Sequence, residues 1–386
     1  IAFIMYGIIP MVVKLAGSFE LFFVNTLGMP FNTGTVIYIA LLVGLLVFGV
    51  WYTIKKNKPV WNNIVLSMVF ILIGYSSFMV LVIRANANTP INENSPDNAI
   101  NLLSYLNREQ YGNWPIFYGA YWDAPLDAND PYSDGNPVYV RDDNKGKYII
   151  TDDKKDSEPN YDKRFKTLFP RMWYMPPESG RQSRTENAYK TWGNLSGNKI
   201  RVSMPDGSSE MRQKPTFGEN LTYFFRYQVG HMYMRYFLWN FSGRQNDIEG
   251  HGNIKHGNWI TGINGLDKAR LGDQSDLPSS MKNPANNKFY MLPLLLGLVG
   301  FFYQLYKDPK NTLVVGMLFL MTGLAIIVYL NQYPFQPRER DYAYAGSFMA
   351  FTIWVGFGVI AVAQGLKKVL GGNISAIAAT LICLLL

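Results

Sequence analysis

The chain has 386 residues, 48% of them hydrophobic, a formal net charge of +8 and a single cysteine. Seven lysines less Asp308 account for +6 of that charge, and they lie in short connections beside apolar runs: Lys55, Lys56, Lys58, Lys307, Lys310, Lys367 and Lys368. Nucleic-acid binding needs a clustered basic face, so this distribution argues against a nucleic-acid partner.

The two ends of the chain are apolar and the middle is polar. A membrane-spanning helix needs about 20 mostly apolar residues. The candidate runs are 35–53, 63–83, 290–305, 312–330, 344–363 and 374–386, with 1–13 as a shorter one. The pattern predicts a polytopic α-helical membrane protein, with transmembrane helices in 1–84 and 289–386 and an inserted domain at 85–288.

The lysine-rich connections predict the orientation, because cytoplasmic loops carry an excess of Lys and Arg. They follow alternate spans, so the segment 85–288 and the loop 331–343 are both expected outside the cytoplasm. The outer segment lacks cysteine, since Cys383 is the only one, and this favours a bacterial periplasm over a disulfide-bonded eukaryotic lumen. We therefore expect a multi-pass protein of the bacterial inner membrane with a large periplasmic domain.

One segment near the N-terminus, 18–34, is too interrupted to span a membrane. Glu20, Asn25 and Pro30 stand there among Phe and Leu. It is expected to lie along the outer surface or to re-enter the membrane, and an ordinary amphipathic connector remains the alternative.

The outer segment predicts an α+β domain. A helical pattern runs from Asp97 to Arg108, the string WPIFYG is typical of a strand, and VYVRDDNKGKYIITDD favours a hairpin that turns at 144–147.

The aromatic run 221–241, LTYFFRYQVGHMYMRYFLWNF, is long enough to resemble a further span. A charged residue in mid-bilayer costs about 2.5–3.5 kcal/mol, and Arg226 and Arg235 would both lie there. We therefore expect a buried or interfacial helix. On a helical wheel Gln228, His231 and Arg235 form a polar stripe, which is either an internal seam or the wall of a wet cavity.

Familiar catalytic motifs are missing from the sequence. His251 and His256 stand in HGNIKH near Asp247 and Glu249, but the intervening Gly and Asn disfavour a metal-binding helix, so no metal is expected. The chain has no P-loop, GxGxxG, GxSxG or CxxC motif, and nucleotide-driven transport and thiol redox chemistry have no support.

The loop NQYPFQPRERDYAYAG, residues 331–346, is the strongest functional signal. Guanidinium groups bind phosphate bidentately, so Arg338 and Arg340, with Arg84 as a weaker partner, suit the phosphate of a lipid-linked donor. Alternatively, Glu339 and Asp341 neutralise these arginines in an ion-pair cluster, or the arginines contact phospholipid headgroups.

Several long strings resemble a known family: IRANANTPINENSPDNA, SYLNREQYG, LFPRMW, YQVGHMYMRYFLWNFSGRQND and NQYPFQPRERDYAYAGSF. They resemble the bacterial DUF2723 membrane family, which is grouped with the GT-C glycosyltransferases and related to a eukaryotic protein O-mannosyltransferase of the endoplasmic reticulum. The resemblance implies a GT-C-like helical bundle. It also implies transfer of a sugar, mannose by kinship, from a polyprenyl-phosphate donor to Ser or Thr of a periplasmic acceptor protein, with no other cofactor.

The acidic motif of that family, a DCGEF-like stretch, would precede Ile1. The catalytic carboxylate is therefore unknown, both ends are expected to be cut, and the fragment alone is expected to be inactive. Possible substrate-cleft residues are Glu339, Asp341, His231, Arg235, Arg244 and Asp247.

Two alternatives remain open. One is a surface-glycan ligase or polymerase of the same general type. The other is a non-catalytic scaffold or channel in an envelope complex, in contact with membrane lipid and protein partners. A transporter ranks lower, because the predicted spans hold almost no ionisable groups.

Overall fold

The computed structural model describes residues 9–87, 89–107, 109, 112, 114–177, 179–274, 277–278, 283–336 and 340–384. The chain forms two compact units. The N-terminal unit comprises Ile1–Asn113 with Tyr132–Asn160, and the C-terminal unit comprises Trp114–Pro131 with Tyr161–Leu386. These two units are defined by contacts between residues. The boundaries predicted from the sequence, at 84/85 and 288/289, separate apolar from polar segments instead, so the two units do not test them and they stay predictions.

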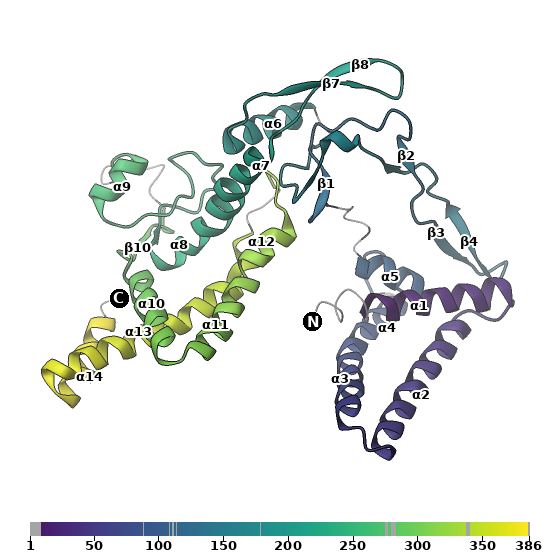
Figure 1. The fold of residues 1–386 in the computed structure, drawn as a ribbon, viewed down its shortest axis with the longest axis horizontal. Helices are drawn as coiled ribbons and strands as arrows, with labels where there is room; N and C mark the ends of the chain where they lie inside the picture. The colour runs from purple at the N-terminus through teal and green to yellow at the C-terminus, as the bar shows by residue number, and fades with distance from the viewer. Residues whose placement is uncertain are drawn as a thin grey trace. The chain divides into compact units, whose positions relative to one another are not determined.

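The N-terminal unit consists of apolar helices and short strands (Figure 1). Its helical elements are α1 (Ile9–Leu21), the π-helix η2 (Phe22–Thr26), α2 (Thr33–Lys55), α3 (Pro59–Tyr75), the 3-10 helix η3 (Ser76–Phe78), α4 (Met79–Asn86) and α5 (Ala99–Asn107). Its strands are β2 (Tyr132–Ser133), β3 (Val138–Asp142), β4 (Lys147–Asp152) and β5 (Glu158–Pro159).

A buried carboxylate organises the segment 18–34, which runs from the end of α1 through η2 to the start of α2. Glu20 is fully buried. It accepts hydrogen bonds from the backbone N–H of Asn32 (2.5 Å) and Thr35 (2.9 Å) and from the hydroxyl of Tyr148 (3.2 Å). The first backbone N–H groups of a helix have no partner within it, and a negative charge there is stabilising. Glu20 therefore caps α2 from the neighbouring helix.

The predicted hairpin is confirmed. Strands β3 and β4 pair antiparallel around the turn 143–146, where Gly146 takes the positive φ of +61° that glycine tolerates. The hairpin is fastened to η2, because Asn25 Nδ2 donates to Tyr148 O and Asn25 Oδ1 accepts from Tyr148 N, both at 2.9 Å.

The C-terminal unit combines a polar part with a bundle of apolar helices (Figure 1). The polar part holds β1 (Tyr118–Ala120), η5 (Lys163–Phe165), β6 (Lys166–Leu168), α6 (Ser179–Gly193), β7 (Lys199–Ser203), β8 (Ser209–Gln213), α7 (Phe217–Tyr223), the π-helix η6 (Phe224–Met234), α8 (Arg235–Phe241), β9 (Gly243–Arg244), α9 (Asn264–Leu271) and β10 (Asn287–Lys288). The bundle holds α10 (Leu292–Lys307), α11 (Pro309–Met321), α12 (Leu324–Leu330), η8 (Asp341–Tyr344), α13 (Ala345–Leu370) and α14 (Gly372–Leu384).

The strands of the described residues pair only two by two and antiparallel: β1 with β6, β2 with β5, β3 with β4, β7 with β8, and β9 with β10. The core is therefore built on helices. Its largest cluster joins aromatic side chains of α6, α7, η6 and α8 to the ends of the bundle helices, with Tyr189, Tyr223, Tyr233, Tyr236 and Tyr344 almost fully buried.

Four helical stretches are long and apolar enough to cross a membrane: Thr33–Lys55, Pro59–Asn86, Pro309–Leu330 and Asp341–Lys367. They contain the predicted runs 35–53, 63–83, 312–330 and 344–363, which confirms a helical protein with several candidate spans. The runs 290–305 and 374–386 fall on the shorter α10 and α14. The membrane concerned and the orientation in it stay predictions.

The helix expected at 221–241 is confirmed as a buried helix outside the candidate spans. It is continuous from α7 through η6 to α8, and a capping box of Thr216 and Glu219 starts it. Its middle is π-helical over eleven residues. Such π-helical turns are rare and are frequently found at functional sites, and here η6 forms one wall of a cleft.

Candidate functional site: an aromatic cleft beside the π-helix

A cleft in the C-terminal unit lies among α6, η6, the loop 249–251 and the loop 333–336. It comprises two adjoining cavities of about 290 and 280 Å³, which share Arg184, His251, Pro334 and Phe335. We call it the aromatic cleft, after the rings that line it: Tyr174, Trp192, Tyr227, Tyr333 and Phe335.

Ring contacts hold this lining in place. Tyr174 and Tyr333 stack with their centroids 3.9 Å apart and an interplanar angle of 28°. Phe335 lies under the guanidinium of Arg184 at 4.5 Å, and His251 approaches its edge at 4.7 Å. The cleft therefore offers flat apolar faces next to polar groups.

Three polar side chains stand exposed at this cleft: Arg184 on α6, and Glu249 and His251 on the loop that faces it. Within the described residues none of the three forms a hydrogen bond or an ion pair, which leaves their donors and acceptors available to a ligand. Arg184 offers a planar fork of donors, and the carboxylate of Glu249 offers acceptors.

His231 lies at the deep end of the cleft, in a third cavity of about 20 Å³ that Arg235 and Glu249 also line. Its ring lies 5.1 Å from that of Trp192 and 5.7 Å from that of Tyr227, and Nε2 lies 2.9 Å from Gly250 O. The pKa of His231 is lowered to about 3, chiefly by burial and secondly by the nearby positive charge of Arg235. The imidazole is therefore neutral near pH 7 and donates from Nε2 to the carbonyl.

The predicted polar stripe proves to be chiefly an internal seam. Gln228 Nε2 donates to Gln332 O at 2.8 Å, and Arg235 Nη1 donates to Gly257 O at 3.0 Å. Ser242 Oγ continues the row by donating to Ile260 O at 2.8 Å. His231 and Arg235 also line the small third cavity. The stripe is therefore the wall of a cavity at these two residues and an internal seam elsewhere.

The loop 331–336 that lines the cleft is held by its first residues. Asn331 ends α12 in the left-handed conformation with φ at +43°. Its Nδ2 donates to Pro115 O (2.6 Å) and to Pro170 O (2.9 Å). Gln332 Oε1 accepts from the hydroxyl of Tyr344 at 3.0 Å. These bonds bring Tyr333 and Phe335 to the cleft.

Sequence reasoning missed the cleft, and it also missed that Arg171 is a buried residue that joins separate segments of the unit. Arg171 is fully buried and donates to Val328 O at 3.0 Å and to Ile116 O at 2.6 Å. Burial lowers the pKa of its guanidinium to about 10. An arginine flanked by Pro170 and Met172 was a usable signal, because a charged residue among apolar neighbours is usually buried with specific partners.

The predicted phosphate-binding arginines are only partly placed. Arg338 and Glu339 lie outside the described residues. Arg340 is half-buried, and its Nε has no hydrogen-bond partner in the described part of the chain. Asp341 is exposed at the start of η8, and Arg84 is exposed on α4 in the N-terminal unit. Their grouping around a phosphate stays a prediction.

Arg244 and Asp247 do not line the aromatic cleft. Arg244 Nε donates to Ala285 O at 3.1 Å, and its guanidinium lies 5.3 Å from the ring of Trp239. Asp247 accepts from Asn283 Nδ2 at 2.5 Å. Both fasten the segment 283–287 to the chain that follows α8. In the ranges that the structure describes, no three His, Cys, Asp or Glu side chains gather closely enough to hold a metal ion.

Comparison with known proteins does not support the family that the sequence strings resemble. Residues 112–225 match the model of a family of unknown function, DUF8416, which covers under a third of the chain. No match supports DUF2723 or the GT-C glycosyltransferases, so the resemblance to that family is wrong. No curated protein and no solved structure matches. The matched segment carries the cleft residues from Tyr174 to Trp192, whereas Tyr227, Glu249, His251 and the loop 333–336 lie outside it.

Proposed function

We propose that the aromatic cleft binds a saccharide and that this membrane-bound protein transfers a sugar there. The observation that carries the proposal is the close association of flat aromatic faces with the side chains of Arg184, Glu249 and His251, which have no hydrogen-bond or ion-pair partner among the residues that the structure describes. Ligand sites are typically apolar concavities with a few placed polar groups. A sugar suits this one because its C–H face packs on rings while its hydroxyls bond to the polar groups.

The chemistry assigned to the cleft is a single displacement. Glu249 accepts the proton of the acceptor hydroxyl as the acceptor oxygen attacks the anomeric carbon. The bond from that carbon to the donor phosphate breaks, and its electron pair leaves with the phosphate. Arg184 stabilises the negative charge that develops on the leaving group. In this proposal the donor is a polyprenyl-phosphate hexose and the acceptor a Ser or Thr hydroxyl outside the cytoplasm.

The count of carboxylates favours transfer or simple binding over hydrolysis. A glycoside hydrolase ordinarily uses a pair of carboxylates on either side of the scissile bond. Among the described residues that line the cleft, Glu249 supplies the one carboxylate. A non-catalytic saccharide receptor is therefore the second candidate.

A binding assay and a transfer assay separate the two candidates. The purified full chain is titrated with a panel of hexose oligosaccharides by calorimetry and incubated with polyprenyl-phosphate hexose and an acceptor peptide. Tyr333→Ala, which removes the stacked ring, should weaken binding at least tenfold. Glu249→Gln should keep binding and abolish transfer, while Glu210→Gln on β8 should alter neither.

If Tyr333→Ala bound saccharide with wild-type affinity, the aromatic cleft would not be the binding site. Transfer by Glu249→Gln at the wild-type rate would remove the assigned base. Binding without transfer in the wild-type protein would favour the receptor.

A further inference from the structure

Three large apolar side chains of the polar part of the C-terminal unit are strongly exposed. They are Phe117 (73% exposed), Leu168 on β6 (69%) and Phe225 on η6 (60%). We call them the β1–β6 patch, since Phe117 immediately precedes β1. An exposed cluster of this kind marks an interaction site more often than isolated apolar residues do.

Phe169 joins the members of the patch. Its backbone N–H donates to Phe117 O at 2.6 Å, next to the pairing of Tyr118 with Leu168. Its ring lies 5.1 Å from that of Phe224, which precedes Phe225 in the chain. Phe117, Leu168 and Phe225 therefore come from neighbouring segments of the unit that are held together by Phe169.

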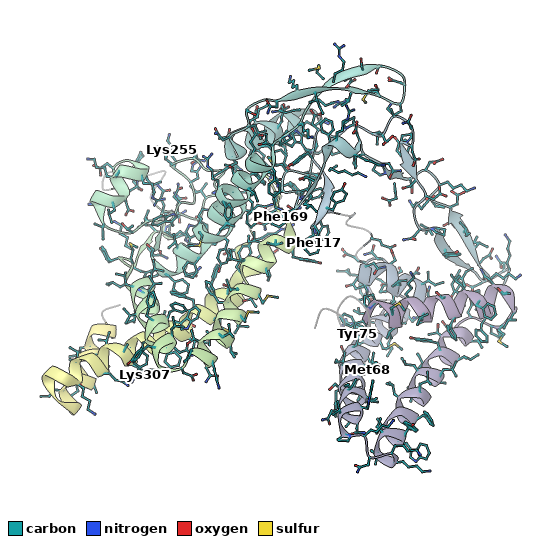
Figure 2. All side chains as sticks on the ribbon, viewed as in Figure 1. Met68, Tyr75, Phe117, Phe169, Lys255 and Lys307 are labelled. Atoms are coloured by element: carbon teal, nitrogen blue, oxygen red, sulfur yellow. The ribbon has the colours of Figure 1, made fainter. Side chains whose placement is uncertain are left out.

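The patch is tied directly to the end of a candidate membrane span. The guanidinium of Arg171 stacks on Phe169 at 3.7 Å and donates to Val328 O in the last turn of α12. Trp114 Nε1 donates to the next carbonyl, Tyr329 O, at 2.9 Å. Figure 2 shows Phe117 and Phe169 beside that end of α12.

The position of the candidate span indicates the depth of the β1–β6 patch relative to the lipid bilayer. The stretch Pro309–Leu330 is long and apolar enough to cross a membrane, so its last turn comes to the bilayer surface. Groups that bond to the carbonyls of that turn lie at headgroup level, where aromatic side chains are enriched in membrane proteins.

We propose that the β1–β6 patch inserts into the interfacial layer of the lipid bilayer. Phe117, Leu168 and Phe225 enter the boundary between headgroups and acyl chains, and the polar part of the C-terminal unit rests on the membrane there. Arg171 remains beneath the patch and holds it to α12. This inference concerns a surface distinct from the aromatic cleft and does not depend on sugar transfer.

Site-specific fluorescence quenching in vesicles tests the proposal. Cys383→Ser removes the only cysteine, and Leu168→Cys or Phe225→Cys is then labelled with a small fluorophore. The labelled full chain is reconstituted into phosphatidylcholine vesicles that contain a headgroup-nitroxide lipid, and aqueous iodide is the second quencher. Met211→Cys on the β7–β8 hairpin is the matched control, since Met211 is an apolar residue with 54% exposure.

The nitroxide lipid should quench the probes at 168 and 225 several-fold more than the probe at 211, and iodide should show the reverse order. Equal access of iodide to all three positions would overturn the proposal. Protection from both quenchers would overturn it as well, because it would show that a protein surface covers the patch.

Discussion

Gln228 Nε2 donates to Asn331 Oδ1 across 3.1 Å, which links the π-helix to the residue that ends α12. The amide nitrogen of the same Asn331 donates to Pro115 O and Pro170 O. One fully buried side chain therefore joins the candidate span Pro309–Leu330 to three segments of the polar part of its unit.

Asn331→Ala should destabilise the C-terminal unit. It removes three buried hydrogen bonds and leaves partners unpaired, which should lower the free energy of unfolding by about 2–4 kcal/mol. Thermal unfolding in detergent measures the effect. Asn240→Ala on α8 is the control, because that exposed amide donates to Tyr236 O of its own helix and to no other described residue. Equal midpoints for the two variants would contradict the role assigned to Asn331.

Glu20→Ala should loosen the attachment of the β3–β4 hairpin to the N-terminal unit. The change leaves the N–H groups of Asn32 and Thr35 and the hydroxyl of Tyr148 without their acceptor, at a cost of about 2–4 kcal/mol. Trypsin cleavage at Lys145 in the hairpin turn should accelerate. Glu20→Gln should show a smaller effect, because its amide oxygen still accepts. An unchanged cleavage rate in Glu20→Ala would refute the prediction.

The low pKa of His231 predicts a loss of stability in acid. Its pKa falls from 6.5 to about 3 in the folded protein, so between these values the unfolded chain binds a proton that the folded chain does not. The stabilisation is complete above about pH 6.5 and is lost as the pH falls through that window. The midpoint of thermal unfolding should therefore drop between pH 7 and pH 5.

His231→Gln keeps an amide donor for Gly250 O but does not titrate, so it should reduce this drop. His256→Gln in the loop that follows the cleft residues serves as the control and should leave the drop unchanged. A wild-type pH dependence in His231→Gln would show that another group is responsible.

Gly300→Ala should disrupt the crossing of α10 and α13. A methyl group at Gly300 would overlap the carbonyl oxygen of Trp354, and small residues are what allow membrane helices to approach so closely. We expect a loss of about 1–3 kcal/mol from the forced separation. Gly316→Ala on α11 meets no atom within 4 Å and should be neutral. Matching stabilities in detergent would contradict this packing.

Several features were predictable because they depend on local chemistry. Four of the six long apolar runs predicted as spans fall on helices that are long and apolar enough to cross a membrane, since a spanning helix needs about 20 apolar residues. The turn-rich string between Val138 and Asp152 predicted the β3–β4 hairpin from its polar turn residues. The cost of placing Arg226 and Arg235 in a bilayer indicated a buried or interfacial helix at 221–241, and the structure shows a largely buried helix there that is not among the candidate spans.

The resemblance of long strings to DUF2723 led to the wrong family. Part of those strings is explained by packing. Arg171 in LFPRMW binds the carbonyls of Val328 and Ile116, and Asn331 in NQYPF binds those of Pro115 and Pro170. Neither arrangement requires a sugar donor, so these parts of the strings are accounted for by the packing of loops.

By itself the sequence determined which segments are apolar enough for a membrane and where the main hairpin turns, because both depend on residues that are neighbours along the chain. Only the tertiary structure decided that Tyr174, Arg184, Glu249 and Phe335 share one cleft. These residues come from four separate segments, and they meet through long-range hydrogen bonds and ring stacking that no local pattern encodes. The same holds for Glu20, whose role as a cap for α2 arises from the packing of one helix end against the next.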